Sequence, residues 1–112
     1  MITLEALKGY GADTDEALAR CMNNEEFYLK LVGKSLDDGN YEKLKEMINE
    51  KKLEEAFAAA HALKGLVTNL ALTPLAEPII EITEGLRARE DRDYSEPLAR
   101  MDDQLARLKM LR

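Results

Sequence analysis

The only histidine of the chain, His61, lies in a run of helical period, with Lys64 three residues and Gly65 four residues beyond it. In an α-helix, these offsets bring residues to one face, about one turn apart. An imidazole with an ordinary pKa of about 6.5 is largely neutral at cellular pH, so a ring nitrogen can act as nucleophile without a separate base. A lysine ammonium beside it can neutralise charge on a phosphoryl group bound to the ring. These residue types therefore indicate a phosphoryl acceptor.

The glycine and the helical wheel support this interpretation. Glycine inside a helix costs about 1 kcal/mol relative to alanine, and a missing side chain beyond His61 would let another protein approach the imidazole closely. At about 100° per residue, two sets of side chains fall on different sides of the helix: His61, Lys64, Gly65 and Thr68 on one, and Ala60, Leu63, Val67 and Leu70 on the other. We therefore expect the imidazole to face outwards.

Two polar residues follow the glycine. Thr68 and Asn69 could orient the imidazole or a phosphoryl group, although surface or helix-end hydrogen bonding explains them equally well. We take Thr68 as a candidate phosphate-binding or partner-binding residue with Lys64 and Gly65. Together with His61 as the acceptor, these residues make up the predicted site.

Turn signals divide the chain into helical segments that would position this site. Near the N-terminus, Thr3 can cap a short helix that ends near Gly11, and Asp13 with Glu16 can form a capping box for a helix over 15–22. Both short helices are expected to be peripheral.

Two further segments precede the site helix. Asn23 or Asn24 can cap a helix that breaks at residues 37–40, and a second helix over 41–50 follows directly. Because so little chain separates them, these two are expected to run as one interrupted column.

The longest segment, 52–72, carries the site. Thr73 is expected to cap the next helix, with Pro74 in its first turn, whereas Pro78 should delay or kink that turn. A final helix is expected to start at Ser95, and its apolar residues follow the spacing of a bundle seam: Leu98, Met101, Leu105 and Leu108.

Short turns between long helices predict antiparallel neighbours. We therefore expect an all-α fold, an up-and-down antiparallel four-helix bundle with short N-terminal helices. A chain of 112 residues fits one domain. Within this single domain (1–112), residues 1–22 would be the peripheral helices and residues 24–111 the helical bundle.

Composition excludes several classes of function. A formal charge of −6 provides no basic stripe for nucleic acid. No long apolar run indicates a membrane segment, and the first residues lack the basic region and apolar run of a secretory leader, so we expect a cytoplasmic protein and, by default, a monomer. Cys21 is the only cysteine, which excludes an intramolecular disulfide and a zinc set. A carboxylate-bridged metal site is also unexpected, because Ala58 stands where a Glu-x-x-His pair with His61 would need its glutamate.

The run from His61 resembles the motif of the histidine-containing phosphotransfer (HPt) family, in which lysine and glycine stand third and fourth after the histidine. The resemblance covers nearly the whole chain and is most specific over 53–72. Residues 73–75 also look like part of the HPt helical hairpin, and residues 24–28 look similar to the opening of small stand-alone members. Two positions depart from the pattern, because Ala71 stands where many members carry glycine and Pro78 lies within the following helix. Both departures leave the acceptor face intact.

The resemblance implies a mechanism. His61 would accept a phosphoryl group, on Nε2, from a phospho-aspartate of a response-regulator receiver domain and pass it to an aspartate of another receiver. The chain would be a phosphocarrier rather than an enzyme, with no cofactor of its own, because the receiver contributes Mg²⁺ and most catalytic groups. Small or apolar residues near the acceptor face are candidates for the docking surface, namely Phe57, Ala58 and Leu72.

Two alternatives remain at this stage. The chain could be the phosphoacceptor of a separate chemotaxis-type histidine kinase acting in trans, since it has no glycine-rich ATP-binding motif of its own. It could also be an adaptor that binds receivers without accepting phosphate. The intact acceptor motif argues against an adaptor, which would not need the nucleophile.

Overall fold

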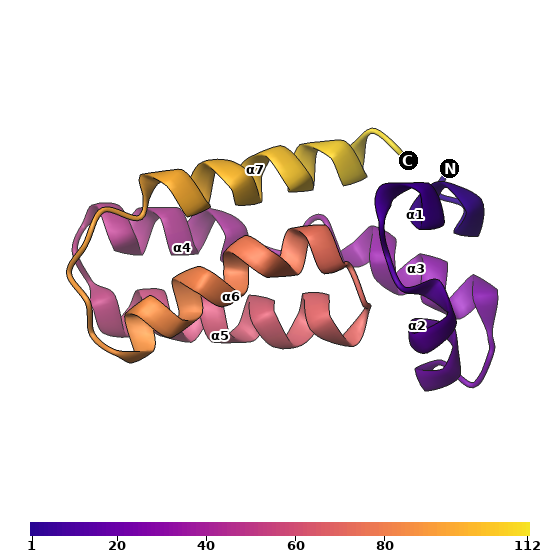
Figure 1. Ribbon diagram of the computed structural model, residues 1–112, viewed down its shortest axis with the longest axis horizontal. Coiled ribbons are helices and arrows are strands. Elements are labelled where there is room, and N and C mark those ends of the chain that lie inside the picture. The colour runs from indigo at the N-terminus through magenta and orange to yellow at the C-terminus, as the bar shows by residue number, and fades with distance from the viewer.

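The computed structural model describes residues 1–112 and contains seven helices and no strand. These helices are α1 (Leu4–Tyr10), α2 (Thr14–Arg20), α3 (Glu25–Ser35), α4 (Asn40–Asn49), α5 (Leu53–Asn69), α6 (Thr73–Arg87) and α7 (Ser95–Lys109). The last four run up and down beside one another (Figure 1), so the predicted all-α bundle is confirmed. None of the helices is long and apolar enough to span a bilayer.

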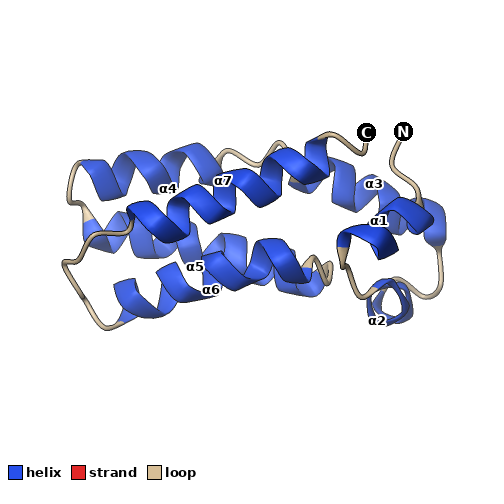
Figure 2. Ribbon diagram, turned by 45° about the horizontal axis from the view of Figure 1, so that its top comes forward, coloured by secondary structure: helices blue, strands red, loops and turns tan.

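Helices α4 to α7 form the bundle itself. α5 packs between α4 and α6, and α6 packs on α7. An ion pair between Lys45 on α4 and Asp102 on α7, 3.3 Å apart, links the first and last helices. Helices α1, α2 and α3 lie together at one end, and α3 leads into α4 along the long axis of the molecule (Figures 1 and 2).

The predicted caps of the first three helices are present. The side chains of Thr3, Asp13 and Asn24 accept hydrogen bonds from backbone N–H groups in the first turns of α1, α2 and α3, at 3.0 to 3.2 Å. Each bond satisfies one of the backbone donors that a helix start leaves without an intrahelical partner. Local sequence therefore fixes where these helices begin.

The start of α6 differs from the prediction. Leu72, not Thr73, is the N-cap, and Thr73 and Pro74 are the first two helical residues. Pro78 does not delay the helix, which begins five residues earlier and continues to Arg87. The proline removes only the hydrogen bond that its N–H would have made to Pro74, and its ring is buried in the bundle, where apolar contact compensates part of that loss.

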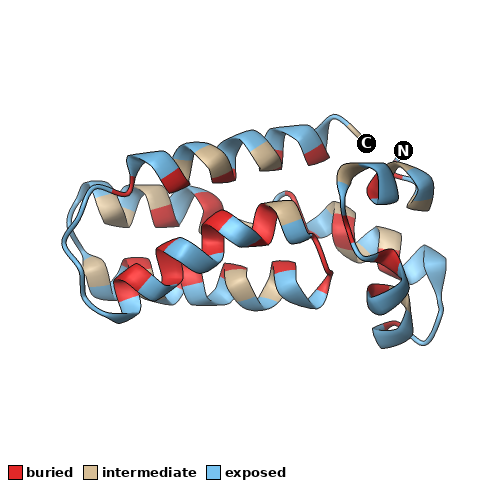
Figure 3. Ribbon diagram, viewed as in Figure 1, coloured by how far each residue is buried: buried red, intermediate tan, exposed pale blue.

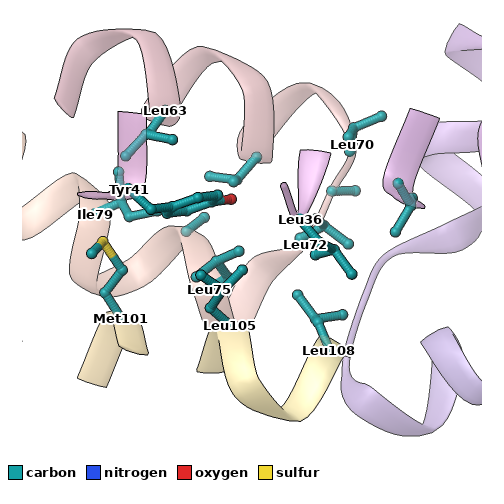
Figure 4. Packing of buried hydrophobic residues seen from close by; sticks show 14 of the residues in the cluster. Leu36, Tyr41, Leu63, Leu70, Leu72, Leu75, Ile79, Met101, Leu105 and Leu108 are labelled. Atoms are coloured by element: carbon teal, nitrogen blue, oxygen red, sulfur yellow. The ribbon is translucent and has the colours of Figure 1, made fainter. Parts of the chain in front are cut away.

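One apolar core fills the bundle. Each long helix is red along one side and pale blue along the other in Figure 3, as expected for helices with one apolar face. Tyr41 of α4, Leu63 of α5, Ile79 of α6 and Met101 of α7 meet in its middle (Figure 4). This packing holds α5 so that one face is fixed inwards and the other is left to solvent.

Candidate functional site

The predicted orientation of the site helix is confirmed. On α5, Leu63 and Val67 are completely buried, whereas His61 and Gly65 are exposed. The bundle therefore determines which way the imidazole points, and it presents His61 to solvent from the middle of a 17-residue helix. A position inside a long packed helix keeps the backbone of the site rigid.

An aromatic ring supports the imidazole on one side. Phe57 lies one turn before His61, and their rings stack with centroids 5.6 Å apart and an interplanar angle of 23°. Arg87 of α6 lies over the Phe57 ring, with its guanidinium carbon 5.2 Å from the centroid. Stacking and a cation–π contact restrict both rings without a hydrogen bond to the imidazole nitrogens.

Lys64 is held by α6. Its Nζ donates to Oε1 of Glu84 at 3.2 Å, and its side chain is 31% exposed. The Nε of Arg87 lies 3.3 Å from the other oxygen, Oε2, of the same carboxylate. Hydrogen bonding from Lys64 is the largest cause that lowers the pKa of Glu84, and the charge of Arg87 adds to it. The ammonium that was expected beside the imidazole is thus paired with a carboxylate in this structure.

Gly65 lies one turn after His61 on the exposed face of α5. Beyond its chain neighbours and the nearby backbone of α5, no atom lies within 4 Å of the place that a Cβ would occupy at Gly65. Thr68, one turn further on, donates its hydroxyl to the carbonyl of Lys64 at 2.6 Å, so this group serves a bond within the helix. The end of α5 is held by Arg20 of α2, which donates to the carbonyls of Thr68 and Asn69 at 2.9 Å.

The three residues proposed for the docking surface differ in their exposure to solvent. Phe57 is half-buried and Ala58 is exposed, so both belong to the surface around His61. Leu72 is completely buried and cannot contact a partner. That expectation was wrong because Leu72 is the residue at which the chain turns from α5 into α6, where its side chain enters the core.

Sequence reasoning missed Glu84, Arg87 and Arg20. Glu84 and Arg87 form an i, i+3 pair on α6, a pattern visible in the sequence, but their contact with the site depends on how α5 and α6 are aligned. Arg20 lies more than 40 residues from the carbonyls that it binds. No local signal could have indicated it.

The arrangement combines a solvent-exposed nucleophile with two nearby cations. A phosphoryl group on His61 would find an ammonium and a guanidinium within the same surface region, and both form strong hydrogen bonds to phosphate oxygens. No group of three or more histidine, cysteine, aspartate or glutamate side chains is arranged to hold a metal ion.

Comparison with known proteins gives one match. A family model described as the Hpt domain matches residues 38–110, a region that contains α4 to α7 and the motif residues His61, Lys64 and Gly65. No curated protein and no solved structure gives a significant match.

Proposed function

Because this chain belongs to the Hpt domain family, which serves phosphotransfer in two-component signalling, we propose that His61 is its phosphoacceptor. Members of this family are phosphocarriers rather than classical enzymes, and they interact with receiver domains and kinases. In the proposed reaction, His61 takes a phosphoryl group from a receiver phospho-aspartate and passes it to another receiver. The chain is thus an intermediate of a phosphorelay.

The transfer is a displacement at phosphorus. The Nε2 lone pair of a neutral His61 imidazole forms a bond to phosphorus, while the phosphorus–oxygen bond to the receiver aspartate breaks and its carboxylate leaves with the electron pair. Nδ1 keeps its proton, so the ring carries a positive charge beside the transferred group. The reverse sequence delivers the group to the next aspartate. Such a transfer depends on in-line positioning and charge stabilisation.

This chain supplies the nucleophile and part of its surroundings. Phe57 restricts the ring by stacking, Lys64 places positive charge beside it, and the open surface at Gly65 leaves room for a receiver active site. The receiver is expected to hold the Mg²⁺ that stabilises charge on the phosphoryl oxygens. Thr68 would contribute through the backbone of α5, because its hydroxyl bonds to the Lys64 carbonyl.

The observation that carries the proposal is the exposed imidazole on a rigid helix whose neighbouring turn is open. A histidine that served stability would be expected to bury its ring or share it in hydrogen bonds. His61 is instead exposed and stacks on one aromatic ring, that of Phe57.

Transfer from a radiolabelled phosphorylated receiver domain, with Mg²⁺ present, tests the proposal. The chain has one histidine, so a preparation without a histidine tag leaves His61 as the only site for phosphohistidine. The expected product is labelled, acid-labile and alkali-stable, and His61→Gln abolishes it. Acid-stable label, or label that persists in His61→Gln, would contradict the proposal.

The same assay separates the two alternatives. Label that comes only from ATP through a separate histidine kinase, and from no receiver, would favour a kinase substrate. Receiver binding without label, by folded native protein, would favour an adaptor.

A further inference from the structure

One carboxylate lies between the two cations nearest the acceptor. Glu84 contacts Lys64 through Oε1 at 3.2 Å and Arg87 through Oε2 at 3.3 Å. Each cation therefore uses a different oxygen of the same side chain. All three side chains are partly exposed, so none of these pairs is locked inside the core.

Arg87 is also placed with respect to the imidazole. It lies over Phe57, which stacks on His61, so the guanidinium, the phenyl ring and the imidazole form one connected series. Lys64 lies on the opposite side of His61 along α5, three residues further on. Glu84 and Arg87 come from neighbouring turns of α6, which packs along α5. Along the axis of the α5–α6 pair, His61 thus lies between Arg87 on one side and Lys64 on the other.

Phosphorylation would change the competition for these cations. A carboxylate carries one negative charge, whereas a phosphoryl group carries up to two charges and three strong acceptor oxygens. Pairs between partly exposed groups are weak and readily exchanged. A phosphoryl group beside them would therefore attract Lys64 and Arg87 away from Glu84, and the free carboxylate would be repelled.

From this geometry we infer that Arg87 is a second cation for the phosphoryl group on His61, and that Glu84 holds Arg87 and Lys64 until the group arrives. The inference rests on the proposed function of His61. Glu84 stabilises the unphosphorylated form, and Arg87 stabilises the phosphorylated form. The two side chains thereby shift the equilibrium between a phosphorylated receiver and phosphorylated His61, in opposite directions.

The equilibrium between a phosphorylated receiver and His61 tests the inference. Glu84→Gln should raise the ratio of phosphorylated to unphosphorylated His61 about fivefold, and Arg87→Gln should lower it by a similar factor, as expected for unit charges a few ångströms away in water. Opposite signs are diagnostic, because two residues that served only the stability of the fold would both reduce labelling.

Matched variants control for net charge. Glu77→Gln removes a negative charge two turns earlier on α6, and Arg89→Gln removes a positive charge just beyond the helix; neither residue forms an ion pair in the structure. Both should leave the ratio within twofold of native. Equal effects of Arg87→Gln and Arg89→Gln, or of Glu84→Gln and Glu77→Gln, would overturn the inference.

A second measurement does not depend on any receiver. Phosphoramidate can load the imidazole directly, with ammonia as the leaving group, and NMR can follow the Arg87 Nε–Hε and Lys64 Nζ signals. Both signals should move on loading of native protein, and the Arg89 Nε–Hε signal should not. Unchanged Arg87 and Lys64 signals in loaded protein would overturn the inference, whereas failure of receivers to label His61 would overturn only the proposed relay function.

Discussion

Gly65 is the residue of the site where a methyl group can be added without a steric clash inside the chain. Since no atom beyond the nearby backbone of α5 and its chain neighbours lies within 4 Å of its Cβ position, Gly65→Ala should remove the helix penalty of glycine and raise the free energy of unfolding by about 1 kcal/mol. The methyl group would occupy space that a receiver needs beside His61, so transfer should slow by about tenfold or more. Urea denaturation and the transfer rate measure the two effects.

Gly33 provides the matched control for this substitution. It lies in α3, away from His61, and its Cβ position is equally free of neighbours. Gly33→Ala should therefore give the same gain in stability and leave transfer unchanged. Transfer at the native rate by Gly65→Ala would contradict the access role of this glycine.

The sequence correctly predicted those features of the site that depend on the period of a single helix. The exposed positions of His61 and Gly65 follow from the period of a single helix and the apolar residues opposite them. Glu84 and Arg87 could not be found in this way, because their place at the site depends on the packing register of α5 against α6. Leu72 was misplaced for a related reason, since the turn after α5 determines which way it points.

At the scale of elements, five helix ends share one device. The C-cap of α1, and the residue after the C-cap of α2, α4, α5 and α6, adopt a positive φ, and the N–H groups around them donate back to carbonyls of the last turn. Glycine fills this position in α1 only; the others are Met22 (φ 56°), Lys51 (φ 59°), Ala71 (φ 56°) and Arg89 (φ 58°). The left-handed region costs a residue with a side chain about 1 kcal/mol or more.

This device explains why the end of the site helix was misjudged. Glycine is the usual sign of such an ending, and with alanine at position 71 the periodic pattern predicted a helix up to 72. α5 instead ends at Asn69, and the N–H groups of Ala71 and Leu72 bond to the carbonyls of Thr68 and Val67. The chain therefore keeps the turn that glycine would make, with an alanine in it.

Lys51 tests the cost of the left-handed conformation. Its side chain is 76% exposed and lies 4.0 Å from Asp91, so little packing is lost on truncation. Lys51→Gly should raise the free energy of unfolding by about 1 kcal/mol and the melting temperature by about 4 °C. Lys43→Gly, at an exposed position inside α4, should have the opposite sign and a similar size. A lower melting temperature for Lys51→Gly would contradict this account.

At the scale of the whole molecule, the N-terminal helices secure the end of the site helix. Arg20 of α2 donates to the Thr68 and Asn69 carbonyls, and the Tyr28 hydroxyl of α3 donates to the Leu70 carbonyl at 2.9 Å. These carbonyls lie in the last turn and at the C-cap of α5, where backbone acceptors lack the usual N–H partner four residues further on. Residues that precede the family match at 38–110 therefore help to hold the helix that carries His61.

The bundle could be predicted from sequence because each long helix shows its own apolar stripe. Contacts between distant segments could not be predicted in the same way. Gly85 is one example: the buried Tyr94 side chain lies so close to it that an added Cβ would be 2.8 Å from the hydroxyl oxygen. This contact joins α6 to the start of α7, and only the folded chain brings the two residues together.

The buried tyrosines predict a loss of stability in alkali. Burial raises the pKa of Tyr28 to about 12, and it also raises the pKa values of Tyr10, Tyr41 and Tyr94. Between about pH 10, where an unfolded tyrosine ionises, and the higher folded pKa, the unfolded state holds fewer protons than the folded state, so stability falls as pH rises. The stabilisation from these protonated tyrosines is fully present below about pH 10.

Tyr28→Phe measures how much one of these tyrosines contributes to the loss of stability. At about pH 8 the variant should be less stable than native protein by about 1 kcal/mol, because the Leu70 carbonyl loses its donor. Between about pH 10 and about pH 12 it should lose less stability than native protein, by about 2 kcal/mol, since phenylalanine cannot ionise. Urea unfolding at several pH values measures both differences. Equal losses of unfolding free energy in the two proteins would show that Tyr28 ionises in the folded state as readily as in the unfolded chain. That result would contradict the role of Tyr28 as a protonated donor to the end of α5.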